Sequence, residues 1–264
     1  MAVLNITPDS FSHDGKVFDG QASFDAILSH ADLCLAEGAT ILDVGGESTR
    51  PGAAPVPESE ELDRVVPVVE ALSARFDTVI SVDTSTPNVM IESAAYGARM
   101  INDVRALLRE GAMAAALQTG LPVCLMHMQG TPQTMQNQPT YDDAVDDVYQ
   151  WLMTRVDVCR DAGFTTDQLL LDPGFGFGKE FEHNVALFRS LDRFVQSGYP
   201  VLVGVSRKTM IGDMTGRPIE QRVTGSAVAA AIAASHGAAI LRVHDVAETH
   251  DAMAVMQTLT QGMQ

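Results

Sequence analysis

Eight short apolar runs along the chain each end in a polar side chain that could bind a ligand or take part in a reaction. A single aspartate or asparagine after a strand is ordinarily a helix cap or a turn former. Here polar residues follow every run, and they include arginine and lysine, which cap nothing, so a shared site explains them better than chance. They are Asn5, Asp43, Asp83, Asn102 with Asp103, His127, Asp172, Ser206 with Arg207 and Lys208, and Arg242 with His244.

These side chains divide into two chemical groups. The acceptors are Asp83, Asn102 and Asp172, and the cations are Lys208, Arg242 and His244. Carboxylates pair well with the planar N–H edge of a heterocycle such as a pterin or a guanine. Cations suit a phosphate or pyrophosphate, and an arginine can also stack on a flat ring. The pattern predicts a site that holds a heterocycle on one side and an anion on the other.

The elements that must position these residues are strand-like runs alternating with amphipathic runs, without repeats or linkers. The expected strands are 2–6, 40–44, 78–83, 99–103, 122–127, 168–172, 200–206 and 239–244. They read as nearly continuous apolar segments, which is typical of a parallel sheet covered on both faces. Eight βα units predict one TIM-barrel domain over residues 1–264, in which the strand ends converge on one mouth. A doubly wound open sheet gives the same alternation and is the alternative.

Helix signals fit this alternation. Gly38 is placed to end the first helical segment. Pro87 follows three hydroxyl residues and predicts the start of the third. Pro67 lies inside the second and should kink it, and segment 140–162 is a long helix with an acidic start.

Composition narrows the class of protein. The 264 residues are 46% apolar, enough for one sizeable core, and no apolar run reaches the ~20 residues that span a bilayer. The formal net charge of -17 argues against a nucleic-acid surface, so no nucleic-acid or membrane partner is expected. The chain starts in a strand-like run without a leader, and its three cysteines lack CxxC spacing. We expect buried, reduced thiols in a cytoplasmic protein.

Two motifs invite misreading. "DPGFGFGK" (172–179) resembles a phosphate loop, but Pro173 stands where that motif has glycine and Glu180 follows Lys179. Its glycines should instead allow sharp turns or close approach to a ligand. His127 has no second histidine at ligand spacing, so we expect a hydrogen-bonded histidine at the mouth and no transition-metal site.

Several longer motifs resemble those of the dihydropteroate synthase family, in order over nearly the whole chain. They are "LNITPDSFS" (4–12), "ILDVGGESTRPGA" (41–53), "SVDTSTP" (81–87), "INDVRAL" (101–107), "LMHMQGTPQTMQ" (125–136), "LLLDPGFGFGK" (169–179), "VGVSRKTMIG" (203–212) and "RVHDV" (242–246). The resemblance implies a TIM-barrel homodimer that uses Mg²⁺. It also implies the condensation of 6-hydroxymethyl-7,8-dihydropterin diphosphate with p-aminobenzoate, which yields dihydropteroate and pyrophosphate. Sulfonamides would inhibit the reaction by mimicking p-aminobenzoate.

The resemblance also implies roles for residues in the matching motifs. The dihydropterin edge would be held by Asp83, Asn102, Asp172 and Lys208. Arg242 would stack on the ring and, with His244, bind the pyrophosphate, which Thr49 would also touch. Asn5 would reach the magnesium–pyrophosphate group.

Two loops would complete the p-aminobenzoate site. The first carries Phe11, Ser12, His13 and Asp14, and the second carries Arg50 and Pro51. Phe11 and Pro51 would flank the aromatic ring, and Ser206 would lie near its carboxylate.

Two features depart from the family pattern. The family's "FSDGG" is "FSHDGK" (11–16) here, so either His13 replaces the aspartate or Asp14 is that aspartate displaced by one position. Many members also have a β-hairpin before the first strand, and the expectation is that this chain lacks it.

Three other functions compete with the synthase. A pterin-binding methyltransferase acting on a corrinoid would share the acceptors but would need neither loop. A pterin-binding protein without catalysis, or a relative with another aromatic substrate, would fit the altered first loop. A Schiff-base aldolase could use Lys208 beside Arg207, although nothing else indicates a carbonyl substrate.

Overall fold

Eight parallel strands form the centre of the molecule in the computed structural model, which describes residues 1–6, 20–48, 56–130, 135 and 139–260. The strands are β1 (Ala2–Asn5), β2 (Ile41–Gly45), β3 (Val79–Asp83), β4 (Met100–Asp103), β5 (Val123–Met126), β6 (Leu169–Asp172), β7 (Leu202–Val203) and β8 (Ile240–Leu241). The first six pair in sequence order, and β7 pairs with β8. Each expected strand is therefore present, although the last two are shorter than predicted.

Backbone contacts at two seams close the strands into a barrel. Leu171 pairs with Val201 between β6 and β7, and its N–H donates to the carbonyl of Pro200 at 2.9 Å. Ala2 pairs with Val243 just beyond β8, and the N–H of Val3 donates to the Val243 carbonyl at 3.0 Å. The strand order runs from β1 round to β8 and back to β1, so the TIM barrel is confirmed and the open sheet is wrong.

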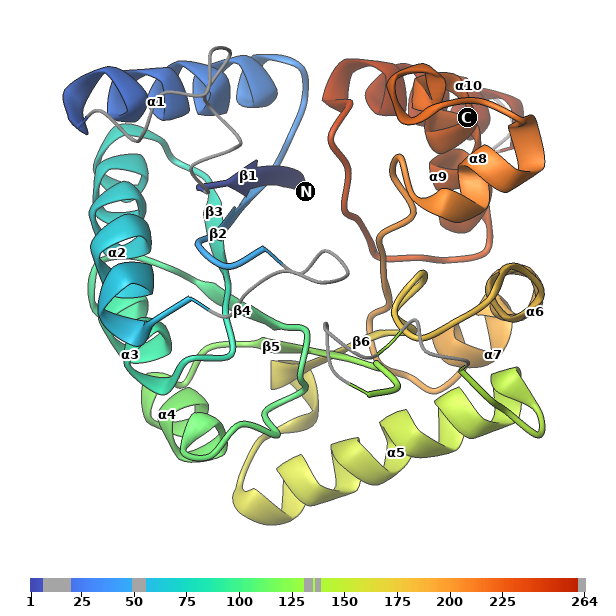
Figure 1. The fold of residues 1–264 in the computed structure, drawn as a ribbon, viewed down its shortest axis with the longest axis horizontal. Coiled ribbons are helices and arrows are strands. Elements are labelled where there is room, and N and C mark those ends of the chain that lie inside the picture. Colours follow the sequence, from blue (N-terminus) through green and yellow to red (C-terminus); the bar gives the residue numbers. More distant parts are fainter. Residues whose placement is uncertain (7–19, 49–55, 131–134, 136–138, 261–264) are drawn as a thin grey trace.

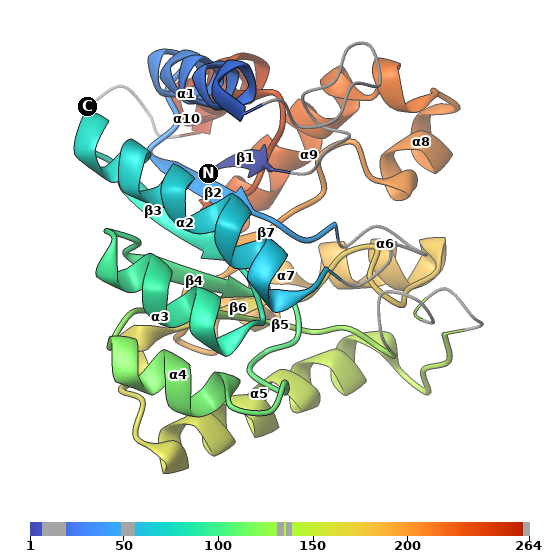
Figure 2. The same cartoon turned by 60° about the vertical axis from the view of Figure 1, so that its left-hand side comes forward.

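The helices form a ring around this barrel (Figures 1 and 2). They are α1 (Gly20–Ala36), α2 (Glu58–Arg75), α3 (Pro87–Ala95), α4 (Ala112–Thr119), α5 (Ala144–Ala162), α6 (Phe181–Arg189), α7 (Leu191–Val195), α8 (Thr209–Thr215), α9 (Val223–Ser235) and α10 (Val246–Thr260), with 3₁₀ turns at Thr166–Gln168 and Ile219–Gln221. The sequence predicted one helix after each strand, whereas two follow β6 and two follow β7. None of the described helices is long and apolar enough to cross a membrane.

Local signals explain where several helices begin and end. Pro87 is the first residue of α3, as its missing N–H allows. Asp143 caps α5 and accepts from the N–H groups of Val145 and Asp146 at 2.9 and 3.0 Å. Gly38, just past α1, has φ +103°, and α2 continues through Pro67.

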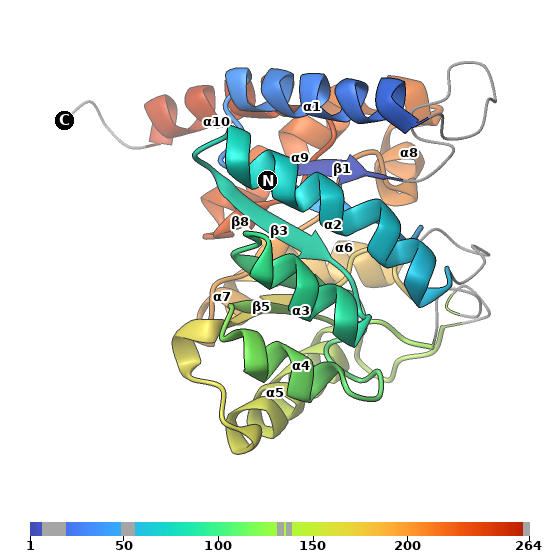
Figure 3. The ribbon, with the colours of Figure 1, turned by 90° about the vertical axis from the view of Figure 1, so that its left-hand side faces the viewer.

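Strand register brings polar residues together at one end of the barrel. Asn5, Gly45, Asp83 and Asn102 pair in turn across β1 to β4. Figure 3 shows β1 and β3 running in the same direction, so their carboxyl ends lie on one side. This end is the mouth predicted from the sequence.

A buried apolar layer lies beneath the mouth. It consists of Met100, Cys124, Leu170 and Leu202. Met100 and Leu170 each stand two residues before a mouth residue, Asn102 and Asp172, and therefore face the same way along the strand. Cys34, Cys124 and Cys159 are all buried and unpaired, and their burial agrees with the prediction.

Candidate active site at the barrel mouth

The structure brings the described candidate residues together at the carboxyl ends of the strands. They are Asn5, Asp83, Asn102, Asp172, Ser206, Lys208, Arg242 and His244. Seven other candidates lie outside the described residues: Phe11, Ser12, His13, Asp14, Thr49, Arg50 and Pro51. The site is therefore built below from strand ends and from the described loops after β4, β6, β7 and β8.

Arg242, just after β8, reaches across the mouth to two carboxylates on other strands. Its Nε donates to Asp43 Oδ2 at 2.6 Å, and its Nη2 donates to Asp83 Oδ2 at 2.7 Å. Asn102 Nδ2 donates to the same Asp43 oxygen at 3.2 Å. Asp43 is fully buried and its other oxygen, Oδ1, has no partner within the described residues. One cation thus organises acids from β2 and β3.

Burial sets the protonation behaviour of this cluster. It raises the pKa of Asp83 to about 7, although Arg242 opposes the shift and the neighbouring acids reinforce it. Burial also opposes the charge of Arg242, but Asp43 and Asp83 outweigh it and raise the pKa of the guanidinium. Asp83 can therefore change charge near neutral pH while Arg242 stays a cation.

A second acid–cation pair occupies the opposite wall. Asp172, at the end of β6, accepts from the Gly174 N–H at 2.7 Å, and burial raises its pKa against the effect of Lys208. Lys208 Nζ donates to the Phe175 carbonyl at 2.5 Å and lies 4.6 Å from the centre of the Phe177 ring. Burial lowers the pKa of Lys208 to about 8, with Asp172 opposing. The wall offers a buried acceptor beside a titratable amine.

Ser206 and His244 form a linked pair between these walls. Ser206 Oγ lies 3.1 Å from both the backbone nitrogen and Nδ1 of His244. Crowding by protein atoms, followed by the charges of Arg242 and Arg207, lowers the pKa of His244. The sequence predicted a cation here, and the direction of this pKa shift favours the neutral ring. Arg207 pairs with Asp245 and does not face the acids of the mouth.

His127 and the glycine-rich motif are structural parts of the mouth. His127 Nδ1 lies 2.9 Å from the buried Lys179 Nζ, which confirms a hydrogen-bonded histidine. Gly174, Gly176 and Gly178 have φ of +70°, +79° and +63°, so this segment makes the sharp turns expected of it. Among the described residues no group of three histidine, cysteine or acidic side chains could hold a metal ion.

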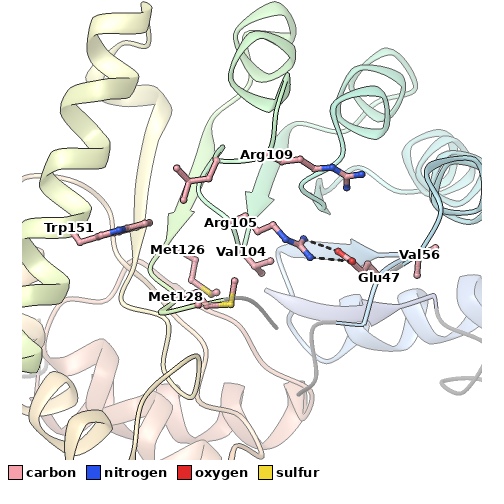
Figure 4. Close-up of a pocket in the computed structure, with 10 residues that line it drawn as sticks. Glu47, Val56, Val104, Arg105, Arg109, Met126, Met128 and Trp151 are labelled. Atoms are coloured by element: carbon pink, nitrogen blue, oxygen red, sulfur yellow. Dashed lines mark hydrogen bonds and ion pairs between the residues drawn. The ribbon is translucent and has the colours of Figure 1, made fainter. Parts of the chain in front are cut away.

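An apolar cavity of about 440 Å³ adjoins the mouth (Figure 4). Met126 and Met128 lie between Trp151 on one side and Arg105 on the other. Arg105 Nη1 and Nη2 donate to the two oxygens of Glu47 at 2.9 and 3.3 Å. Met126 at the end of β5 lines the cavity and is in register with Asp172 on β6. Its flat and flexible walls suit part of an aromatic ligand.

Three residues in or near the site were not assigned a role from the sequence. Asp43 was noted as a strand-end residue, and the same signal that selected Asp83 could have selected it. Arg105 follows Asp103 in the loop after β4, and Lys179 ends the glycine-rich segment. Neither follows a strand directly, so the strand-end pattern could not find them.

Known proteins resemble the chain over nearly its whole length. The family described as "Pterin binding enzyme" matches residues 1–244. A dihydropteroate synthase from Escherichia coli (strain K12) is 53% identical over 97% of this chain and 90% of its own length. The Yersinia pestis dihydropteroate synthase with a sulfonamide drug has 52% identity and a TM-score of 0.93, over 99% of this chain and 94% of its own. That of Xanthomonas albilineans with 7,8-dihydropteroate has 45% identity and a TM-score of 0.89, over 100% and 93%.

Proposed function

The chain belongs to the dihydropteroate synthase family of pterin-binding enzymes, and from this premise we propose which of its residues perform the reaction. The enzyme condenses 6-hydroxymethyl-7,8-dihydropterin diphosphate with p-aminobenzoate to give 7,8-dihydropteroate and pyrophosphate. It serves folate synthesis and is a target of sulfonamides. The residue roles below concern one domain over 1–264.

We assign the pterin edge to Asp83, Asn102, Asp172 and Lys208. Two buried acids facing each other across a small mouth are costly unless a donor-rich ligand meets them. The N–H edge of a dihydropterin supplies such donors, and a carboxylate accepts them strongly. The apolar layer beneath, which includes Cys124, provides a floor for a flat ring.

We assign the diphosphate to the side formed by Arg242 and His244, with Thr49 outside the described residues. Arg242 donates hydrogen bonds to two acids and remains charged. The same guanidinium can therefore stack on the pterin ring and neutralise charge on the leaving anion. A neutral His244 can donate one hydrogen bond to a phosphate oxygen, and Ser206 fixes the orientation of its ring.

Mg²⁺ fits this site only as an ion carried largely by the substrate. The donor set at the mouth includes the amide oxygen of Asn5, and the described residues form no acidic cage. Mg²⁺ commonly binds through few protein ligands and substrate phosphates. We propose that Asn5 contributes to holding the ion, which would neutralise charge on the departing diphosphate. His13 or Asp14 is the further candidate.

The transition state resembles a cation on the dihydropterin methylene. Asp83 and Asp172 stabilise positive charge on the ring while Arg242 and His244 stabilise the leaving anion. The aniline nitrogen is a neutral nucleophile that needs no strong general base. We propose that Phe11 and Pro51 flank its ring, that Ser12 and Arg50 belong to the closing loops, and that Ser206 lies near its carboxylate.

The single observation that carries these roles is the meeting of two buried acids, Asp83 and Asp172, with the cations Arg242 and Lys208 at one mouth. The test is pyrophosphate release from the dihydropterin diphosphate with Mg²⁺, with and without p-aminobenzoate. Release that depends on p-aminobenzoate, with dihydropteroate formed, supports the proposal. If pyrophosphate is released at the same rate with and without p-aminobenzoate, the protein has a working pterin site but no working p-aminobenzoate site. Transfer of methyl to a corrinoid, or borohydride trapping at Lys208, would favour the alternatives.

We further propose a cytoplasmic homodimer. The buried free thiols fit a reducing compartment. On α9, Val228 and Ile232 lie one turn apart and are 53% and 43% exposed, so an apolar face of this helix is open to a second copy. Val228→Glu should give a monomer in light scattering, whereas Val255→Glu on α10 is the control; a dimer in both variants would place the interface elsewhere.

A further inference from the structure

Lys179 is a buried lysine that the proposed reaction does not use. Its side chain is 4% exposed, and its Nζ lies 2.9 Å from His127 Nδ1, 2.9 Å from the Gly174 carbonyl oxygen and 3.0 Å from that of Phe177. The carbonyl oxygen of His127 is a longer fourth contact, at 3.3 Å. Three close acceptors match the three N–H groups of an ammonium ion. Lys179 therefore joins the end of β5 to the segment after β6.

That segment, residues 173–178, makes the contacts that define one wall of the site. The Gly174 N–H donates to Asp172, and the Phe175 carbonyl accepts from Lys208. The Phe177 ring lies against the Lys208 ammonium. A displacement of the segment would change the partners of both groups assigned to the pterin.

The segment is also packed closely against the end of β5. A Cβ added to Gly174 would lie 1.9 Å from the His127 carbonyl oxygen, and one on Gly178 would lie 2.7 Å from that of Gln129. Carbonyl groups crowded at this contact need donors, and Lys179 supplies them to three residues. Without its ammonium group, several buried acceptors would be left without partners.

We propose that Lys179 is a positioning residue for the pterin site, because it fixes the 173–178 segment that holds Asp172 and Lys208 in place. This inference rests on the proposed role of Asp172 in pterin binding. It assigns Lys179 no contact with the substrate.

The charges around Asp172 make this role measurable. It is faced by Lys208 after β7, Lys179 after β6, Arg242 after β8 and the thiol of Cys124 on β5. Burial raises the pKa of Asp172, and Lys208, the Gly174 N–H and Lys179 lower it in that order. Removing the Lys179 amine would remove its own charge from the surroundings of Asp172. It would also weaken the hydrogen bond from the Gly174 N–H, because the segment would be held less firmly. Burial itself lowers the pKa of Lys179, while Asp172 opposes that shift.

The experiment measures the affinity of the protein for 6-hydroxymethylpterin by calorimetry as a function of pH. The acid limb of the profile is the pH range in which affinity falls as Asp172 gains a proton. In Lys179→Met this limb should move to higher pH by at least about 0.5 pH unit. Arg155→Met is the matched control, because Arg155 also donates to two carbonyls, of Ala106 and Leu107, but in the loop after β4. It should lower the melting temperature and leave the acid limb in place.

A second pair of variants decides the matter if Lys179→Met does not fold. His127→Asn keeps an acceptor near the position of Nδ1, whereas His127→Leu removes it. The acid limb should move in the leucine variant and remain in the asparagine variant. The proposal would be overturned if the acid limb of Lys179→Met lay at the wild-type pH. It would also be overturned if the acid limbs of both His127 variants did.

Asp172→Asn separates the two hypotheses. If it loses pterin binding while Lys179→Met behaves as wild type, the positioning role alone is wrong. If Asp172→Asn binds as wild type, the proposed role of Asp172 fails, and the inference about Lys179 fails with it.

Discussion

Replacing Asp43 with asparagine tests whether the ion pairs of Arg242 hold the mouth together. The change keeps the size of a fully buried side chain and removes its charge. Losing one partner of a buried ion pair costs about 3–5 kcal/mol. Arg242 keeps Asp83 at 2.7 Å, and its side chain is 23% exposed, so we expect a cost below this range, about 2–3 kcal/mol.

Thermal unfolding measures this loss. For a chain of this size, roughly 2–4 °C per kcal/mol translates it into a lower melting temperature of roughly 4–12 °C. Asp157→Asn on the exposed side of α5 is the control and should not change the melting temperature. The pterin affinity should fall as well, because Arg242 loses one of the two contacts that fix its plane.

A double-mutant cycle identifies the pair as the cause. Arg242→Met leaves two acids without their cation, so adding Asp43→Asn should cost much less than it does in the wild-type background. The reasoning would be refuted if Asp43→Asn cost less than about 0.5 kcal/mol, or if the two changes were additive within that margin.

Other consequences follow from single features of the structure. Because its folded pKa lies above the ordinary 3.8, Asp83 contributes stability that is complete below 3.8 and lost as pH rises through about 7; Asp83→Asn should remove this slope in denaturant titrations. Gly174→Ala should destabilise by more than the ~1–3 kcal/mol of a left-handed backbone, since its Cβ meets a carbonyl oxygen, whereas Gly198→Ala, with open space around it, should cost only that strain. Arg105→Met and Glu47→Gln should each lower the melting temperature and be non-additive by about 1 kcal/mol, because they remove the same ion pair.

The barrel was predictable because the alternation of strands and helices, and the polar residues at the strand ends, can be read from short stretches of the sequence. Continuous apolar runs identified every strand, and alternation with helices identified the architecture. The lengths of β7 and β8 were overestimated, because the apolar residues Val201 and Val243 beside them make only isolated bridges to neighbouring strands. The break between α6 and α7 at Ser190 carries no proline or glycine signal.

The site was predictable as a set of positions and less so as a set of contacts. Looking for polar residues at strand ends finds Asp83 and Asp172. It does not show that Arg242 forms ion pairs with two acids on other strands. Partners of that kind depend on the way the strands stagger around the barrel. Burial, which the sequence does not give for a single residue, lowers the pKa of Lys208 and hides Lys179.

The scarcity of lysine has a consequence for chemical labelling. The chain has only Lys16, Lys179 and Lys208, and Lys16 lies outside the described residues. Lys179 is enclosed by its acceptors, while Lys208 is partly exposed and its pKa is lowered to about 8. A reagent that acylates free amines at mildly alkaline pH would therefore react at few places, and one of them is a wall of the catalytic mouth. Mass spectrometry of that adduct, with and without a pterin, would footprint occupancy of the site without any engineered probe.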